Sequence, residues 1–179
     1  MRILGVDPGL RVTGYGAIDC GVGGARLVEA GVITPDASAP LEQRLGQLHL
    51  ELRAVLDATR PDFMVIEELW TAYRSPTTAV LMGHARGVLC LAADTCGVPV
   101  RHLAHSLVKR AIVGSGAASK DQVNRMIVEQ LHLLSRPRPN DVSDALALAL
   151  ALGNIERTDA RFGALGLPRP RRTARRAIL

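Results

Sequence analysis

The chain has few aromatic residues, few cysteines and no long hydrophobic run. Phenylalanine, tryptophan and tyrosine make up 3% of its 179 residues, so the core must be built from aliphatic side chains. The three cysteines show no Cys-x-x-Cys spacing, which argues against a zinc site or a disulfide framework. No apolar run approaches the roughly 20 residues that span a bilayer, and no leader-like segment follows Met1. We therefore expect a cytoplasmic protein without a membrane partner.

Acidic residues are missing from the end of the chain, where arginines gather. After residue 160 there are six arginines and no acid, which leaves 16 of the 22 basic residues against 17 acids in the rest of the chain. The net charge of +5 therefore comes from this segment and is weak evidence for a nucleic-acid-binding body. We predict a folded domain over residues 1–157 and a disordered arginine-rich tail over residues 158–179, which would add salt-sensitive affinity for nucleic acid.

The order of apolar segments predicts three strands, then alternating helices and strands, then further helices. Strands are expected over residues 2–7, 12–19, 26–34, 63–67 and 98–103, and helices over residues 40–58, 77–94, 106–113, 119–134 and 140–156. An antiparallel meander followed by parallel crossovers gives an α/β fold with a mixed five-stranded sheet and helices on both faces. The ribonuclease H-like fold has this order of elements.

Acidic side chains stand at the ends of three predicted elements. Asp7 ends the first strand, at the edge where open α/β sheets place ligands, although an aspartate there can also cap a turn. Glu67 and Glu68 both end the fourth strand, and strand alternation puts them on opposite faces without showing which one faces a site. Asp141 and Asp144 share one face of a helix, although acids in a first helical turn are also ordinary helix-start chemistry.

Clustered carboxylates repel one another, so their presence at one place in a protein needs an explanation. Without cations they raise one another's pKa values, and divalent metal removes that cost. Oxygen ligands without a histidine or cysteine cluster favour Mg²⁺, with Mn²⁺ as a substitute. Two such ions can clamp the attacking and leaving oxygens of a phosphodiester. The pattern therefore predicts a metal-dependent endonuclease.

Two further groups of residues are expected to contact DNA. Lys109 and Lys120 are the only lysines in the chain, and Lys120 opens a helix after a glycine-rich stretch, where phosphate commonly binds. Trp70 is the sole tryptophan, and Tyr73 and Arg74 follow it in a polar loop beside the acids. An exposed aromatic ring there can stack on an unpaired base, although a tryptophan is more often part of a core.

An ordered set of short segments resembles the RuvC family of Holliday-junction resolvases. The set runs in family order over about residues 1–155, and its order makes it far more specific than any one segment. The matching segments are Ile3 to Gly9, Val65 to Glu67, Gly83 to Gly87, Val108–Lys109, Val113 to Gly116 with Lys120, and Asp141 to Ala147.

The resemblance implies a homodimer that nicks two strands of a four-way DNA junction with Mg²⁺, leaving 5′-phosphate ends that ligase can seal, in recombination and repair. It selects Glu67 rather than Glu68 to act with Asp7, Asp141 and Asp144 as catalytic and metal-binding acids. It places Lys109 and Lys120 among the family's DNA-contacting lysines, and Trp70 where the family usually has phenylalanine. It also implies the RuvA–RuvB branch-migration motor as a partner.

Three other functions share parts of this pattern. The same acids would serve a related ribonuclease H-fold nuclease that acts on RNA or another structured nucleic acid. An ATPase half of the actin or sugar-kinase type also places Asp and Gly after its first strand, but the chain has no repeat of Asp7 to Gly9. A junction-binding module without catalysis is the third. The apolar helix over residues 77–94 fits either a buried core helix or one shared with a second subunit.

Overall fold

The structure is a computed structural model that describes residues 1–68 and 75–164. Strands and helices follow one another as the sequence predicts, with boundaries that differ by a few residues. The elements are β1 (Arg2–Asp7), β2 (Thr13–Gly21), β3 (Gly24–Ile33), α1 (Leu41–Thr59), β4 (Phe63–Glu67), α2 (Pro76–Thr95), β5 (Val100–Leu103), α3 (His105–Val113), α4 (Lys120–Gln130) and α5 (Asn140–Ala164).

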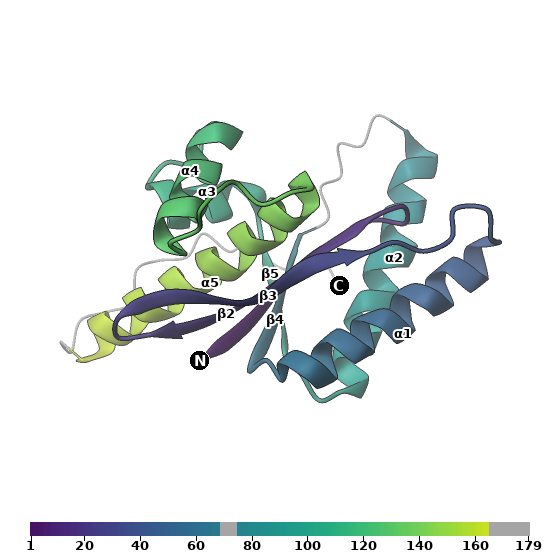
Figure 1. Cartoon of the computed structure of the whole chain (residues 1–179), viewed down its shortest axis with the longest axis horizontal. Coiled ribbons are helices and arrows are strands. Elements are labelled where there is room, and N and C mark those ends of the chain that lie inside the picture. The colour runs from purple at the N-terminus through teal and green to yellow at the C-terminus, as the bar shows by residue number, and fades with distance from the viewer. Residues whose placement is uncertain (69–74, 165–179) are drawn as a thin grey trace.

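The five strands form one mixed sheet in the order β3-β2-β1-β4-β5. The first three strands pair antiparallel, whereas β4 runs parallel to both β1 and β5. Helices α1 and α2 cover one face of the sheet, and α3, α4 and α5 lie on the other (Figure 1). The predicted mixed sheet with helices on both faces is confirmed.

Strand alternation divides the core into two layers. Leu4, Val6 and Met64 pack with α1 and α2, whereas Ile3 and Val65 pack with the helices of the other face. Because side chains alternate along a strand, Asp7 shares the face of Ile3. The end of β1 therefore presents its carboxylate to the side of the sheet that α5 covers.

Helix α5 lies unusually close to the sheet because glycines line its path. A Cβ atom added to Gly5 would lie 1.9 Å from the backbone oxygen of Ala145, and one added to Gly14 would lie 2.1 Å from that of Asp141. Small residues on the helix complete the contact, and Ala145 is fully buried. Contacts between backbones therefore fix the start of α5 against the end of β1 and the start of β2.

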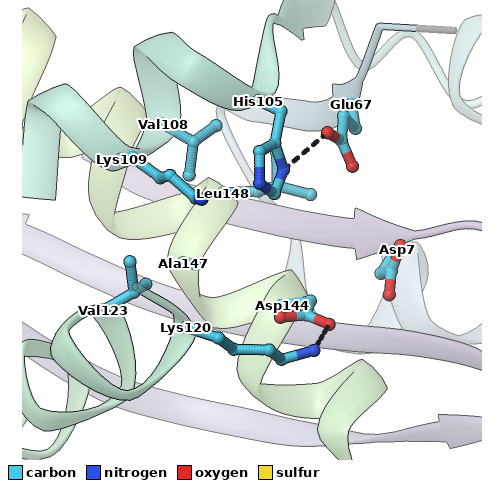
Figure 2. Close-up of a pocket in the computed structure, with 10 residues that line it drawn as sticks. All are labelled: Asp7, Glu67, His105, Val108, Lys109, Lys120, Val123, Asp144, Ala147 and Leu148. Atoms are coloured by element: carbon cyan, nitrogen blue, oxygen red, sulfur yellow. Dashed lines mark hydrogen bonds and ion pairs between the residues drawn. The ribbon is translucent and has the colours of Figure 1, made fainter. Parts of the chain in front are cut away.

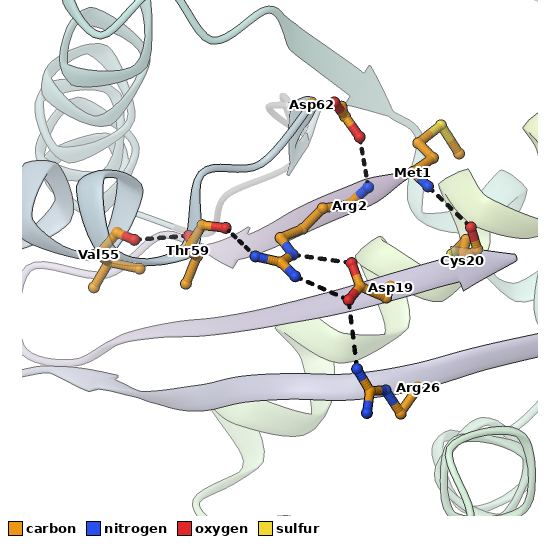
Figure 3. A network of polar contacts seen from close by, with 8 residues as sticks. All are labelled: Met1, Arg2, Asp19, Cys20, Arg26, Val55, Thr59 and Asp62. Atoms are coloured by element: carbon orange, nitrogen blue, oxygen red, sulfur yellow. Dashed lines mark hydrogen bonds and ion pairs between the residues drawn. The ribbon is translucent and has the colours of Figure 1, made fainter.

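At the other end of β1, a network of polar contacts holds the strand to its neighbours (Figure 3). The Arg2 guanidinium donates to both carboxylate oxygens of Asp19, each at 2.9 Å, and to the carbonyl oxygen of Thr59 at 2.8 Å. The Arg2 backbone N–H donates to Asp62. One arginine thus joins β1, β2 and the end of α1.

Two predicted helix ends are wrong. Helix α4 ends at Gln130 rather than at residue 134, because His132 adopts a left-handed backbone conformation with φ of 52° that a helix cannot contain. Helix α5 continues to Ala164, so residues 158–164 of the predicted disordered tail are helical. Its last turns line a groove with the β2–β3 hairpin, through Ala160 and Val22 among others. The remainder of the predicted tail lies outside the described residues.

The starts of two helices lie within one residue of the predicted ranges. Pro40 stands directly before α1, and Ser119 forms a capping box with Gln122 at the start of α4. Among the described residues, no helix is both long and apolar enough to cross a membrane.

Candidate active site

Asp7 and Glu67 stand side by side at the ends of two parallel strands. Val6 is paired with Ile66 in the register of β1 and β4, so the next residue of each strand reaches the same edge of the sheet. Both carboxylates also lie on the face that α5 covers, because Glu67 alternates with the buried Val65. Glu68 is exposed and lies beyond the last residue of β4. The register thus distinguishes two glutamates that strand parity alone left equivalent.

Asp141 and Asp144 reach the same edge from the first turns of α5. The turn before the helix is held by Val142, whose N–H donates to the Pro139 carbonyl oxygen at 3.2 Å, and by Ser143, whose hydroxyl donates to that of Pro137 at 3.0 Å. The backbone of Asp141 lies directly over Gly14, which is the residue paired with Asp7. The close contact of α5 therefore carries both aspartates to Asp7.

A small open pocket of about 150 Å³ joins three of these acids to basic side chains (Figure 2). Asp141 does not line it, although its charge acts on Asp7. The helices α3 and α4 supply the opposite wall. The lining residues are Asp7, Glu67, His105, Val108, Lys109, Lys120, Val123, Asp144, Ala147 and Leu148.

The pKa of Asp7 is strongly raised in the folded protein. Burial, as the largest cause, and the charges of Asp144, Asp141 and Glu67 together raise its pKa from 3.8 to about 7, while Lys120 opposes them. Among the described residues, its carboxylate has no hydrogen-bond or ion-pair partner. The three neighbouring carboxylates repel a negative charge on Asp7, and a cation bound nearby would offset this repulsion.

The other two acids of the pocket each have one partner from the opposite wall (Figure 2). Lys120 donates to Asp144 with 2.7 Å between Nζ and Oδ2. His105 places Nδ1 2.9 Å from Oε1 of Glu67. Lys109, one helical turn after His105, also faces the pocket. The pocket therefore has an acidic wall on the sheet and α5, and a basic wall on α3 and α4.

Comparison with known proteins identifies the family. The family model described as crossover junction endodeoxyribonuclease RuvC matches residues 3–152. A crossover junction endodeoxyribonuclease RuvC from Rhodopirellula baltica is 46% identical over 148 residues, covering 83% of each chain. The chain belongs to the RuvC family. A relative of the same name from Chloroflexus aurantiacus is 40% identical over 163 residues, 91% of this chain and 99% of the other.

Solved structures confirm the ribonuclease H-like fold of this RuvC-family chain. The structure described as Thermus thermophilus RuvC in complex with Holliday junction substrate superposes with a TM-score of 0.80 and is 33% identical in sequence. The match covers 96% of this chain and 99% of the other. The RuvC family predicted from the ordered segments is therefore confirmed.

The donor set suits a divalent metal ion. It offers carboxylate oxygens on one wall, where burial and the neighbouring acids together raise the pKa of Asp7. Within the described part of the chain, no three acidic, histidine or cysteine side chains already surround one point closely enough to ligate an ion. The acids therefore fit a metal by chemistry and by shared location.

Two residues near the acids were not assigned by sequence reasoning. The sequence marks His105 only by its spacing of four residues from Lys109, which places the two side chains on one helix face. Arg86 lies within the Gly83 to Gly87 segment of the resemblance. Its Nε donates to the backbone oxygen of Glu67 at 3.1 Å, and its Nη2 lies 2.6 Å from Nδ1 of His102. Arg86 thus ties α2 to the end of β4.

The predicted DNA-contacting residues divide into two groups. Lys109 and Lys120 both line the pocket. Trp70, Tyr73 and Arg74 lie outside the described residues, so their predicted contacts stay predictions.

Proposed function

We propose that this chain resolves four-way DNA junctions by hydrolysing phosphodiesters at the pocket between the acidic and basic walls. One observation carries the proposal: Asp7, Glu67 and Asp144 converge on one edge of the sheet in a RuvC-family chain. The family relation to a protein solved with Holliday junction substrate supports junction DNA as the substrate class. The carboxylate chemistry alone would serve RNA equally well.

The proposed cofactor is Mg²⁺, two ions per subunit, with Mn²⁺ as a substitute. Asp7, Glu67, Asp141 and Asp144 are the proposed ligands, because they supply the oxygen atoms that these ions prefer. Bound there, the metal would supply positive charge to the attacking and leaving oxygens of the phosphodiester.

The basic wall has a separate proposed role. Lys109 and Lys120 would hold the DNA backbone against the acids, because a lysine ammonium is a compact charge that pairs with phosphate. Lys120 begins α4 and is 52% exposed, so its ammonium group can exchange Asp144 for phosphate when DNA arrives. The contact at 2.7 Å in the DNA-free protein keeps this side chain at the pocket.

Dimer formation and docking to the RuvA–RuvB motor are also proposed from the family relation. Helix α2 supports the dimer, because it carries two largely exposed apolar side chains, Val80 at 59% and Leu91 at 55%. A two-fold dimer would place two sites about one axis, as two nicks in a near-symmetric junction require.

Cleavage assays on a synthetic four-way junction, a linear duplex and an RNA–DNA hybrid test the proposal. We expect the junction to be cut only when Mg²⁺ is present. Asp7→Asn, Glu67→Gln and Asp144→Asn should each reduce cleavage by several orders of magnitude while junction binding persists. Glu68→Gln is the matched control, since its side chain is exposed outside the pocket.

Other results would redirect the proposal. Preference for the hybrid would identify a nuclease of the same fold with another substrate. Cleavage that survived all three acid substitutions would remove the proposed site, and junction binding without cleavage by the unaltered protein would indicate a binding module.

A further inference from the structure

Among the described residues that line the pocket, His105 is the one polar side chain to which the proposed function gives no role. It begins α3, the helix that also carries Lys109, and its ring points from this helix toward Glu67 (Figure 2). Its Nδ1 is 2.9 Å from Oε1 of Glu67, and its side chain is 65% exposed. So exposed a ring contributes little to the core, which indicates that its contact with Glu67 is its main interaction.

We infer that His105 is a positioning residue that holds the Glu67 carboxylate in the orientation required for metal binding. The inference rests on the proposed function, because the orientation of Glu67 matters only if Glu67 is a ligand. The main chain at Glu67 is already fixed by β4 and by the Arg86 contact to its carbonyl oxygen. The remaining freedom lies in the side chain, and His105 restricts it.

The contact leaves Glu67 able to bind an ion. A carboxylate has two oxygens with about four lone-pair sites, and the contact with His105 is made by Oε1, 2.9 Å from Nδ1. The second oxygen stays available. A glutamate that is free to rotate loses that freedom when it binds metal, so fixing it beforehand strengthens binding. Residues that orient metal ligands in this way commonly change metal affinity by roughly 10- to 100-fold when they are replaced.

Lys120 provides a contrast within the same pocket. Its contact to Asp144 brings a full positive charge to a proposed ligand, so Lys120 competes with metal for that carboxylate. The imidazole needs only its N–H to hold Glu67. Positioning by His105 therefore requires a hydrogen-bond donor at the place of Nδ1 and no net charge, which side-chain substitution can test directly.

The test measures binding of Mn²⁺ alone to the full-length, DNA-free protein, with free Mn²⁺ followed by electron paramagnetic resonance. His105→Ala should weaken binding by about 10-fold or more. His105→Asn should restore most of it, because the asparagine amide nitrogen is as many bonds from the backbone as Nδ1 and carries no charge. His105→Gln places its amide one bond further out and should not restore it.

His132→Asn is the matched control for the substitution itself. His132 is exposed outside the pocket, and its positive φ is one that asparagine tolerates. Mn²⁺ affinity should be unchanged in this variant. Thermal melting of all four variants without metal should give curves close to that of the unaltered protein, which would exclude a general loss of folding.

The outcomes separate the inference from the proposed function. If Glu67→Gln left Mn²⁺ binding intact, the proposed metal site would be wrong. If Glu67→Gln abolished binding but His105→Ala did not weaken it, or strengthened it, the positioning role would be overturned and the contact would be a competitor or incidental. Failure of His105→Asn to restore binding would also overturn the role of the hydrogen bond.

Discussion

The carboxylates at the two ends of strand β1 have pKa values that are shifted in opposite directions. At its beginning, Asp19 accepts two hydrogen bonds from Arg2, which is the main cause that lowers the pKa of Asp19 (Figure 3). At its end, burial and the charges of three further acids together raise the pKa of Asp7 to about 7. The strand is only six residues long, so the difference arises from neighbouring elements and not from the strand.

The difference separates a structural use of charge from a functional one. Around Arg2, each charged group has an opposite charge or a backbone partner, as expected where polar contacts join elements. Around Asp7, like charges gather and the pocket remains open, which lowers the stability of the metal-free protein. Electrostatic strain in a pocket is a common mark of a site that binds something.

The sharpest test of this contrast is Asp7→Asn. We expect junction cleavage to fall by several orders of magnitude, because a proposed metal ligand is lost. The same change should stabilise the metal-free protein, because an amide removes a charge that is buried beside three other acids. Cleavage assays and urea unfolding in a chelator at about pH 8 measure the two effects. A less stable variant would show that Asp7 has a structural role instead.

The contact between α5 and the sheet predicts a second large effect. Gly5→Ala should destabilise the protein by about 3 kcal/mol or more, since the new methyl group would overlap the backbone oxygen of Ala145. Gly46→Ala is the matched control, because nothing lies within 4 Å of its added Cβ and alanine favours the interior of α1 by about 0.5–1 kcal/mol. Equal effects in urea unfolding would show that α5 can move away from the sheet at little cost.

The pKa of Asp7 predicts the pH dependence of stability. Asp7 binds its proton more tightly in the folded protein, with a pKa of about 7 against an ordinary value of 3.8. Its contribution to stability is therefore fully present below about pH 4 and is lost as the pH rises through about 7, an effect on the order of a few kcal/mol. The free energy of unfolding in chelator should fall over this range relative to that of Asp7→Asn. Parallel profiles for the two proteins would contradict the shift.

The smallest expected effect comes from the other end of the strand. Asp19→Asn should lower stability by less than about 1 kcal/mol, because both side chains of the Arg2 pair are about one third exposed, at 33% and 32%. The loss should appear at neutral pH and vanish as the pH falls below the pKa of Asp19, since a lowered pKa contributes stability only above it. Thermal melting at several pH values checks this, and junction cleavage should be retained.

Much of the fold was predictable because its signals are local. Short apolar runs predicted β1 and β4, and the helix predicted from residue 119 begins at Lys120 as α4. The ends of α4 and α5 depended on a left-handed residue, His132, and on packing against the β2–β3 hairpin. Neither feature has a marker in the sequence, since a non-glycine residue with positive φ and a distant contact follow from tertiary structure.

The site was predictable as a set of acids but not as an arrangement. Periodicity placed Asp141 and Asp144 on one helix face, whereas the choice of Glu67 over Glu68 required the register of β1 and β4 or a family resemblance. The contacts of His105 and Lys120 join elements far apart along the chain, and no pattern in one sequence shows which side chains meet across a pocket.

The glycine-lined contact beneath α5 gives the two walls of the pocket different freedom to vary. The helix that carries Asp141 and Asp144 is held on the sheet by contacts between backbone atoms. The positions of these acids therefore depend little on side-chain identity elsewhere. The basic wall stands on α3 and α4, which meet α5 through side chains such as Val108, Val123 and Ile127. Substitutions on these two helices can retune affinity for DNA while the acids stay in place. Substrate recognition can thus diverge among relatives faster than the hydrolytic chemistry.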